Sequence, residues 1–330
     1  TYRQQFGQLV VGRAPLEFGL GMTYDAGQGL FDHWFTTRDL VAYKVVLGNI
    51  SITPMFAKID ESTLNRTDDV TEWLAKLLYE NPATNMEMGL IARNRLAGDS
   101  GSDAPTDAGG TGVLGGSGSS ATAELDIEMY NLYVLKDTPT YHLGFEASFQ
   151  RGDLGVRTDT GENVKLNGFG LAFESEYRPV DSAWKFGFNA GSASGDDRET
   201  DGEFEGYIFN KNYDVALLLF NHSLGEADFL RTALVGGGPT QSGNVDVEAI
   251  SNVLYASPYV HYTMSDRWSF QGSLTTGWLQ ADAVANQEGQ DLGYELDLGV
   301  SFEPKEGIRW ISQVGLLSPG TAFEGDGSFD

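Results

Sequence analysis

The chain has 330 residues, none of them cysteine, and its 47 acidic residues outnumber 21 basic ones, so the formal net charge is −26. The lack of cysteine excludes disulfides, thiol catalysis and cysteine-ligated metal sites. The negative charge argues against binding to a nucleic-acid backbone. The longest apolar run, Val215 to Phe220, is far shorter than the roughly 18 residues of a membrane-spanning helix, so helical spans are excluded.

The composition favours strands. The chain contains 42 glycines, 12% aromatic residues and only 10 prolines, which suits repeated strands and turns with aromatic girdles. The mean hydropathy of −0.25 resembles that of a soluble protein, but strands of alternating polarity average to a similar value. A soluble β-sandwich or propeller is the alternative to a membrane barrel. The strand lengths and the lack of a soluble repeat period favour the barrel.

The chain begins with a predicted strand, Phe6 to Ala14, and continues with a segment rich in glycine and aromatic residues, Glu17 to Arg38. A connection of that length is usually functional or folded onto another part of the protein. Two further strands are joined by the short turn Gly48-Asn49. Pro54 in the second of them predicts a bulge or a weakly paired position.

The period of the apolar residues changes after residue 69. Apolar residues recur there at intervals of three and four, at Val70, Trp73, Leu74, Leu77 and Leu78. This spacing predicts a short amphipathic loop helix near 70–80, which Pro82 would end. Such a helix could cap the barrel, plug it, lie at the membrane interface, or pack as part of a loop without a function of its own.

Alternating polarity then returns. The low-complexity segment 98–120 predicts a flexible loop, and residues 221–248 fit a strand, a short helix or a segment folded inward. Further strands are expected at 86–92, 125–135, 141–149, 169–177, 184–190, 213–219, 254–262 and 268–278.

The clearest pattern lies near the C-terminus. Apolar residues alternate with polar or small ones from Leu292 to Phe302, a turn follows at Pro304 to Gly307, and the alternation resumes from Ile308 to Leu316. The first arm is long enough to cross a bilayer at a tilt. The pattern predicts a membrane β-hairpin with one face toward lipid and the other toward a polar interior.

We recognise about 13 strands, whereas bacterial single-chain barrels normally have an even number. The sequence therefore predicts an all-β fold: one transmembrane antiparallel up-and-down β-barrel of about 14 strands (range 12–16) over residues 1–330, with long outer loops. The strand directions fail to alternate within 61–121 and 195–247, so the strand map contains an error in each range. Without a signal segment or a terminal strand, the domain is expected to be incomplete at one or both ends.

The polar face of the strands supplies the candidate site. It predicts a polar, acid-leaning pore with a weak preference for cations. The alternative is a lumen filled by salt bridges and folded-in loops that does not conduct. The predicted pore-lining residues are Lys44, Glu87, Arg93, Arg95, Glu124, Asp126, Glu128, His142, Glu146, Glu174, Glu176, Lys185, Glu295, Asp297 and Arg309.

No catalytic motif is present, because the four histidines are scattered and neither a nucleophile elbow nor a phosphate-binding loop occurs; we expect no enzyme and no catalytic residue. Several acidic loops could hold Ca²⁺ through carboxylate oxygens, although a solvated surface explains them better and none has the EF-hand spacing. These loops are Asp60-Glu61, Asp68-Asp69, Asp196-Asp197, Asp201 to Glu205 and Glu324 to Asp326.

By hairpins such as Gly293 to Val300, the chain resembles Gram-negative outer-membrane β-barrels of the porin type. Gly12 to Pro15, with Gly19 to Gly21, is similar to the strand end and glycine turn of alginate-export-like porins. That family carries an acidic polymer through a lumen lined with Arg and Lys, whereas the predicted lumen here leans acidic. No functional residue is carried over from the family.

Two functions follow as hypotheses. The first is a channel in the bacterial outer membrane for small solutes or ions, narrowed by residues 17–38 and by 70–80 or 222–246. The second is a non-conducting structural or interaction barrel that docks partner proteins in an envelope complex. The expected partners are outer-membrane lipid and lipopolysaccharide, small solutes or ions, and such envelope proteins, but no nucleic acid.

Overall fold

The computed structural model describes the chain over 2–4, 7–32, 34–35, 37–60, 70–97, 122–157, 163–196, 202–221, 249–282 and 289–323. These residues form one sheet of fifteen strands, and fourteen of the strands follow one another in chain order as an antiparallel meander. The fifteenth, β11 (Glu203–Phe204), lies off this path and pairs in parallel with β9. The all-β prediction and the predicted strand number are confirmed.

Most strands are long. The strands of the meander are β1 (Tyr2–Gln4), β2 (Gly7–Pro15), β3 (Thr37–Leu47), β4 (Ile50–Asp60), β5 (Val70–Asn81), β6 (Met86–Ala97), β7 (Thr122–Asp137), β8 (Tyr141–Arg157), β9 (Asn163–Tyr177), β10 (Trp184–Ala193), β12 (Val253–Thr263), β13 (Trp268–Leu279), β14 (Asp291–Lys305) and β15 (Ile308–Ser318). A 3₁₀ turn, η2 (Thr321–Phe323), follows β15. No helix among the described residues is long and apolar enough to cross a membrane.

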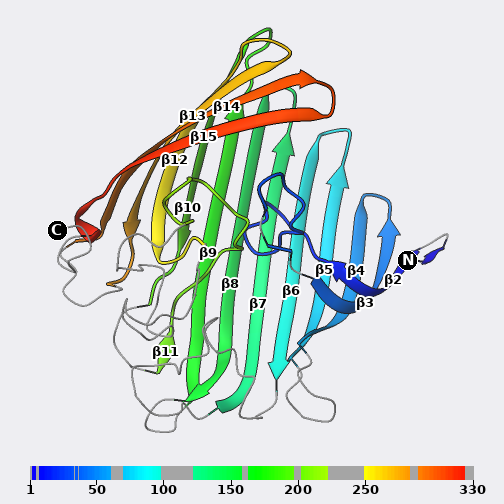
Figure 1. Ribbon diagram of the computed structural model, residues 1–330. Coiled ribbons are helices and arrows are strands. Elements are labelled where there is room, and N and C mark those ends of the chain that lie inside the picture. Colours follow the sequence, from blue (N-terminus) through cyan, green and yellow to red (C-terminus); the bar gives the residue numbers. More distant parts are fainter. Residues whose placement is uncertain are drawn as a thin grey trace.

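The turns at one end of the sheet are short. They join β3 to β4, β5 to β6, β7 to β8, β9 to β10, β12 to β13 and β14 to β15, at the upper end of Figure 1. Chain segments 16–36 and 194–252 connect strands at the opposite end. The sheet curves around described parts of these two segments, which lie against its concave side (Figure 1). No pairing of the described residues joins β15 to β1, so both strands are edges.

The predicted helix near 70–80 is wrong, because these residues form β5. The strand pairs with β4 on one side and with β6 on the other. Trp73 and Leu77 point outward and are exposed, while Leu74 is buried on the inner face. When a strand carries apolar residues on both faces, they can recur at intervals of three and four. This spacing by itself does not distinguish the strand from an amphipathic helix. Adding β5 restores alternating strand directions before residue 121.

The predicted strand at 213–219 is also wrong. These residues form turns and bends on the inner side of the sheet, and Tyr213, Ala216 and Leu219 are buried in an apolar cluster there. The apolar run thus packs against the inner face of the sheet instead of contributing a strand. Removing it from the strand map restores the parity between β10 and β12. The ambiguous stretch 222–248 and the whole low-complexity segment 98–120 lie outside the described residues.

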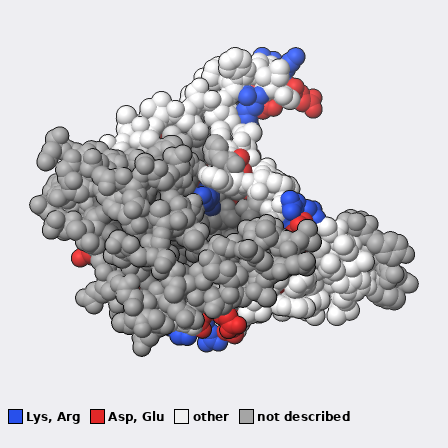
Figure 2. All heavy atoms as spheres, turned by 60° about the horizontal axis from the view of Figure 1, so that its bottom comes forward, with Lys and Arg blue, Asp and Glu red and all other residues white. Residues whose placement is uncertain are grey.

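The outer face of the sheet is apolar. Along β9 exposure alternates residue by residue, with Phe169, Leu171 and Phe173 exposed and Ala172 buried. Charged side chains of the described residues form small groups between broad uncharged areas (Figure 2). Near the short turns, Trp184 packs on Tyr262 at 4.4 Å between ring centroids, and Trp268 stacks on Phe302 at 4.2 Å. An apolar band that ends in paired aromatic rings matches the requirements of a bilayer.

The strands pair in regular register over most of their length. Pro54 lies opposite Ala75 without a register shift, and the irregularity between β4 and β5 falls between Lys58 and Asp60 instead. On the other side of β4, no pair with β3 is formed at Thr53 and Pro54, between the pairs Ala42–Met55 and Val45–Ile52. The predicted bulge is therefore not at Pro54, but the alternative prediction of a weakly paired position there is confirmed.

Candidate functional site in the lumen

Two segments fold inward from the end opposite the short turns. Residues 16–35 and 202–221 lie against the inner face of the sheet, in front of β7 to β10 in Figure 1. The N–H of Asn210 donates to the carbonyl of Met22 at 2.7 Å, and the hydroxyls of Thr23 and Tyr207 lie 2.9 Å apart. The segments are thus hydrogen-bonded to each other as well as to the wall.

Further out, Asn212 bridges to the first segment. Its Oδ1 accepts the Trp34 N–H at 3.1 Å, and its Nδ2 donates to the Trp34 carbonyl at 2.7 Å. The ammonium of Lys211 lies 4.0 Å from the centre of the Trp34 ring, a cation–π distance. The two segments therefore form one body, the double plug (residues 16–35 and 202–221).

A buried carboxylate on β8 holds the first segment. Glu146 is fully buried, and its Oε2 accepts the N–H of Leu20 at 2.7 Å and that of Met22 at 3.3 Å. Its Oε1 accepts the Asn131 amide at 2.7 Å. Gly19 has a φ of +65°, and a Cβ built there would lie 2.5 Å from Glu146 Oε2. Only glycine lets the backbone approach the carboxylate this closely.

A second buried carboxylate, on β14, holds the other segment in the same way. Oε1 of Glu295 accepts the N–H groups of Leu217 at 3.0 Å and Leu218 at 2.7 Å, and Oε2 accepts that of Leu219 at 2.7 Å. Glu295 is fully buried. Because hydrogen bonds to a charged acceptor are about twice as strong as neutral ones, these contacts compensate part of the cost of burying the charge.

A third buried carboxylate organises three arginines. Glu72 on β5 accepts from Arg38 at 2.8 Å and from Arg95 at 2.7 Å, and it lies 3.6 Å from Arg93. The Arg38 guanidinium also stacks over Tyr24 of the double plug at 5.0 Å, and Arg93 Nη1 lies 3.4 Å from the Tyr24 hydroxyl. This cluster ties β3, β5 and β6 to the first segment and is locally positive.

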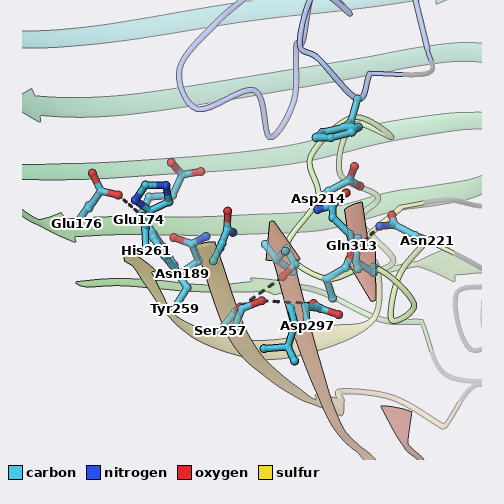
Figure 3. Close-up of a pocket in the computed structure, with 18 of the residues that line it drawn as sticks. Glu174, Glu176, Asn189, Asp214, Asn221, Ser257, Tyr259, His261, Asp297 and Gln313 are labelled. Carbon is cyan, nitrogen blue, oxygen red and sulfur yellow. Dashed lines mark hydrogen bonds between the residues drawn. The ribbon is translucent and has the colours of Figure 1, made fainter. Parts of the chain in front are cut away.

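Between the second segment and the wall lies a cavity of about 620 Å³, the lumen cavity (Figure 3). Four of its lining residues are acidic and two are lysines. Most of the others are amides, hydroxyls and small residues. The charged lining residues are Glu174, Glu176, Asp214, Asp297, Lys185 and Lys211.

The Glu174 and Glu176 end of the lumen cavity is bridged by basic groups. Glu176 accepts from Arg178 at 2.6 Å and lies 3.9 Å from the Lys185 ammonium. The hydrogen bond to Glu176 and the neighbouring Asp137 raise the pKa of Arg178, which lies in the β9–β10 turn. Glu174 lies 3.8 Å from the imidazole of His142. This end is a network of mutually compensating charges.

Within the double plug, burial raises the pKa of the Tyr207 hydroxyl to about 12. Tyr207 therefore stays a neutral hydroxyl at physiological pH and keeps its contact with Thr23.

The structure places eleven of the predicted residues on the inner face: Lys44, Glu87, Arg93, Arg95, His142, Glu146, Glu174, Glu176, Lys185, Glu295 and Asp297. Four of these, Glu174, Glu176, Lys185 and Asp297, line the lumen cavity together. Glu146 and Glu295 hold the double plug, and Glu87 accepts from the Tyr133 hydroxyl. Arg309 is exposed beside the β14–β15 turn, away from the cavity.

The placement of Glu124, Asp126 and Glu128 differs from the prediction, because β7 has the opposite parity. These three acids share the outer face of β7, where Asp126 accepts from Asn94 at 2.7 Å and Glu128 from Arg151 at 2.8 Å. The inner positions are Leu125, Ile127 and Met129, which are buried in apolar clusters. Because the inner face of β7 is also apolar, alternation alone assigns its polar residues to the wrong face of the strand.

Sequence reasoning missed several inner residues. The spacing of the apolar residues predicts a helix around Glu72, and the alternation at 213–219 predicts a strand around Asp214 whose apolar residues would face lipid. Arg38 lies at the end of a predicted loop, although it belongs to β3. One available signal was the alternation of Arg38, Leu40 and Ala42, which extends the strand back to Arg38.

The described residues contain no group of three or more acidic or histidine side chains placed to hold a metal ion. Most of the acidic residues predicted to bind Ca²⁺ lie outside the described ranges, so that expectation stays a prediction.

No protein-family model and no curated protein matches the chain. Among solved structures, it is similar to the Pseudomonas putida toluene transporter TodX, at 11% identity and a TM-score of 0.30, with 86% of this chain and 76% of that chain covered. A second TodX structure gives 10% identity, a TM-score of 0.28, and coverages of 83% and 75%. The FrpB iron transporter from Neisseria meningitidis (F3-3 variant) gives 15% identity and a TM-score of 0.40, with 84% of this chain but only 42% of that chain covered.

Proposed function

We propose that this chain is an outer-membrane β-barrel protein that passes small polar solutes or ions, with a preference for cations, through a lumen narrowed by the double plug. The lumen cavity carries this proposal, because it is an acid-leaning polar space enclosed between the wall and the plug. The resemblance to porin-type barrels in the hairpin pattern agrees with it.

The membrane setting rests on the outer face. Large apolar side chains are exposed along most strands, and aromatic pairs lie near the short turns. In water such a surface would promote aggregation, whereas in a bilayer it is the favourable one. Charged groups on the opposite face need water or partners, which a polar lumen provides.

The preference for cations rests on the lining. Four acidic residues and two lysines line the lumen cavity. A channel wall of low dielectric constant focuses such a field and raises the local concentration of ions of opposite charge. We therefore expect a weak preference for cations rather than strict exclusion of anions.

A second candidate is a non-conducting interaction barrel that docks partner proteins. The anchoring of the double plug by Glu146 and Glu295 favours it, because two fully buried carboxylates fix the plug to the wall. A plug held in this way could close the lumen permanently.

The deciding experiment is single-channel recording of the purified full chain in a planar bilayer under a KCl gradient. A steady current with a cation-selective reversal potential supports the channel, and Glu174→Gln should reduce that selectivity. Asp266→Asn, in the exposed β12–β13 turn, is the matched control and should leave it unchanged. Silence in every preparation, together with a stoichiometric protein partner on purification, would favour the interaction barrel.

A further inference from the structure

A row of paired positions crosses the outer face of the sheet from β2 to β9, near the end opposite the short turns. Most of its residues are charged. Arg13 pairs with Asp39 at 2.7 Å, and Lys165 pairs with Asp153 at 2.6 Å. The charged members of the row are Arg13, Asp39, Lys58, Asp126, Asp153 and Lys165. Charges of both signs thus lie side by side across neighbouring strands.

The next row toward the short turns, two residues along each strand, is polar on β6 to β9 only. On β2 to β5 it is apolar, from Val11 to Trp73. Its polar members are Asn94, Glu128, Arg151 and Asn167. One row further, β6 to β9 are apolar as well, with Ala92, Tyr130, Phe149 and Phe169. The outer face therefore changes from apolar to charged along one continuous boundary.

Tyr130 lies across this boundary. Its hydroxyl donates to Glu128 at 3.4 Å, and the Arg151 guanidinium lies 5.9 Å from the centre of its ring. The ring thus belongs to the apolar row, and the hydroxyl reaches the polar one. Tyrosine prefers this position at a membrane interface, because one end of its side chain is apolar and the other forms hydrogen bonds.

The length of the apolar surface fits one bilayer. On β8 the outward residues from Tyr141 to Phe149 are apolar, and Arg151 is the first charged one. A strand crosses the hydrocarbon core in about 9–11 residues, so the core ends near Arg151. The strand continues to Arg157, and β7 to β9 reach the lower end of the sheet in Figure 1. These three strands therefore extend beyond the apolar surface.

The outer face is hollowed at the boundary. A groove of about 410 Å³ is lined there by Phe149 of the apolar surface and by Arg151 and Lys165. Both basic side chains are more than half exposed, and each uses only some of its donors in its ion pair. Acidic residues line the groove as well, namely Asp126, Glu128, Asp153 and Glu203. A surface with both signs of charge beside an apolar one suits lipid headgroups above their acyl chains.

We propose that the charged residues at this boundary, the headgroup belt (Arg13, Asp39, Asp126, Glu128, Arg151 and Lys165), contact the lipid headgroups of one membrane leaflet, and that β7 to β9 project from the bilayer beyond it. Headgroups and water solvate charges, whereas hydrocarbon does not. The inference rests on the proposed membrane setting and deepens it, because it places one edge of the bilayer on named residues.

The test is a depth profile along β9, whose outward residues cross the boundary in chain order. The chain has no cysteine, so single cysteines are introduced as Asn163→Cys, Asn167→Cys and Phe173→Cys. Each full-length variant is labelled with a small fluorophore and folded into phosphatidylcholine vesicles. Quenching is measured with lipids that carry a nitroxide at the headgroup or deep in the acyl chain, and with aqueous iodide. Asp266→Cys in the exposed β12–β13 turn is the control for full access of iodide.

The strongest quenching should shift from the acyl-chain nitroxide at Phe173→Cys to the headgroup nitroxide at Asn167→Cys. At Asn163→Cys quenching by lipid should be lost, and iodide should quench as it does in the control. A second pair of variants needs no label. Asn167→Lys should fold into vesicles with the yield of the parent, whereas Leu171→Lys, on the same face of β9, should reduce that yield.

The outcomes separate this inference from the proposed function. Quenching by iodide but not by lipid at every position, Phe173 included, overturns the membrane setting and the headgroup belt together. Acyl-chain quenching at both Phe173 and Asn163 leaves the membrane setting intact and overturns the belt, because β9 then does not project. Protection of Asn163 and Asn167 from every quencher overturns the belt in favour of a covering protein surface. The expected profile together with a silent bilayer recording supports the belt and removes the channel.

Discussion

Thr23 and Tyr207 are 184 positions apart in the chain, and their side-chain hydroxyls meet at 2.9 Å inside the lumen. Each residue belongs to a different inward segment. The Asn131 amide of β7 donates to the Thr23 hydroxyl at 2.6 Å and to Glu146, so the contact between the segments is also fixed to the wall. Movement of one segment must therefore disturb the other.

We expect Tyr207→Phe to loosen the double plug without unfolding the sheet. The substitution removes one buried hydroxyl contact, worth about 1 kcal/mol, and retains the ring that packs edge-on against Phe209. Recordings in a planar bilayer should show more frequent or larger openings than the parent. Tyr177→Phe, an exposed tyrosine at the end of β9, is the control. Identical current traces for both variants would show that the Thr23 contact does not limit the opening.

Glu72 gives a prediction about stability. Glu72→Gln leaves Arg38 and Arg93, both almost fully buried, without their anion, and breaking a buried ion pair costs roughly 3–5 kcal/mol. Urea unfolding in detergent or lipid, followed by tryptophan fluorescence, should show a clearly lowered midpoint.

The matched control for Glu72 is Asp39→Asn. Asp39 pairs with Arg13 at 2.7 Å, but both side chains are exposed, so solvent screens the interaction. The unfolding midpoint of this variant should stay close to that of the parent. Equal decreases of the unfolding midpoint in the two variants would show that burial does not make the Glu72 ion pairs more important for stability than the exposed pair.

Glu72 also shows why the sequence predicts the wall better than the interior. Hairpins with one apolar face, such as β14–β15, are visible from alternation alone. In β5 and β7 both faces carry apolar residues, because the inner face packs against the double plug. Alternation cannot identify the inner face of such strands. For the lumen cavity, the sequence predicts only which strands carry polar residues, and it does not predict which of these residues come together.

The partners of the inner residues depend on contacts between distant parts of the chain. Nothing in the sequence near Glu146 or Glu295 indicates that backbone N–H groups of a loop will satisfy them. Gly19 and Gly315 leave the space that brings these groups together, but glycines are too frequent in this chain for the two to be singled out.

Glu295→Gln should release the second segment. The variant retains one oxygen for the N–H groups of residues 217–219, but its amide nitrogen must face at least one donor, and an unsatisfied buried donor costs roughly 1–3 kcal/mol. We expect a higher single-channel conductance than in the parent. Glu303→Gln near the β14–β15 turn, on the same strand, is the control. A conductance no higher than the control would mean that Glu295 does not hold the plug closed.

The lipid-facing assignment is tested by Phe145→Arg on β8. Phe145 lies opposite Val134 and Phe173, midway along an apolar stretch of the outer face, and is exposed. An arginine on the lipid face near the bilayer midplane costs about 2–4 kcal/mol, because the charge must reach water or thin the membrane. Val180→Arg in the exposed β9–β10 turn should cost almost nothing, since its side chain is already exposed at the end of the sheet. Folding yields into lipid vesicles should therefore fall for the first variant alone. Equal yields would contradict a membrane on this face and favour a soluble sheet.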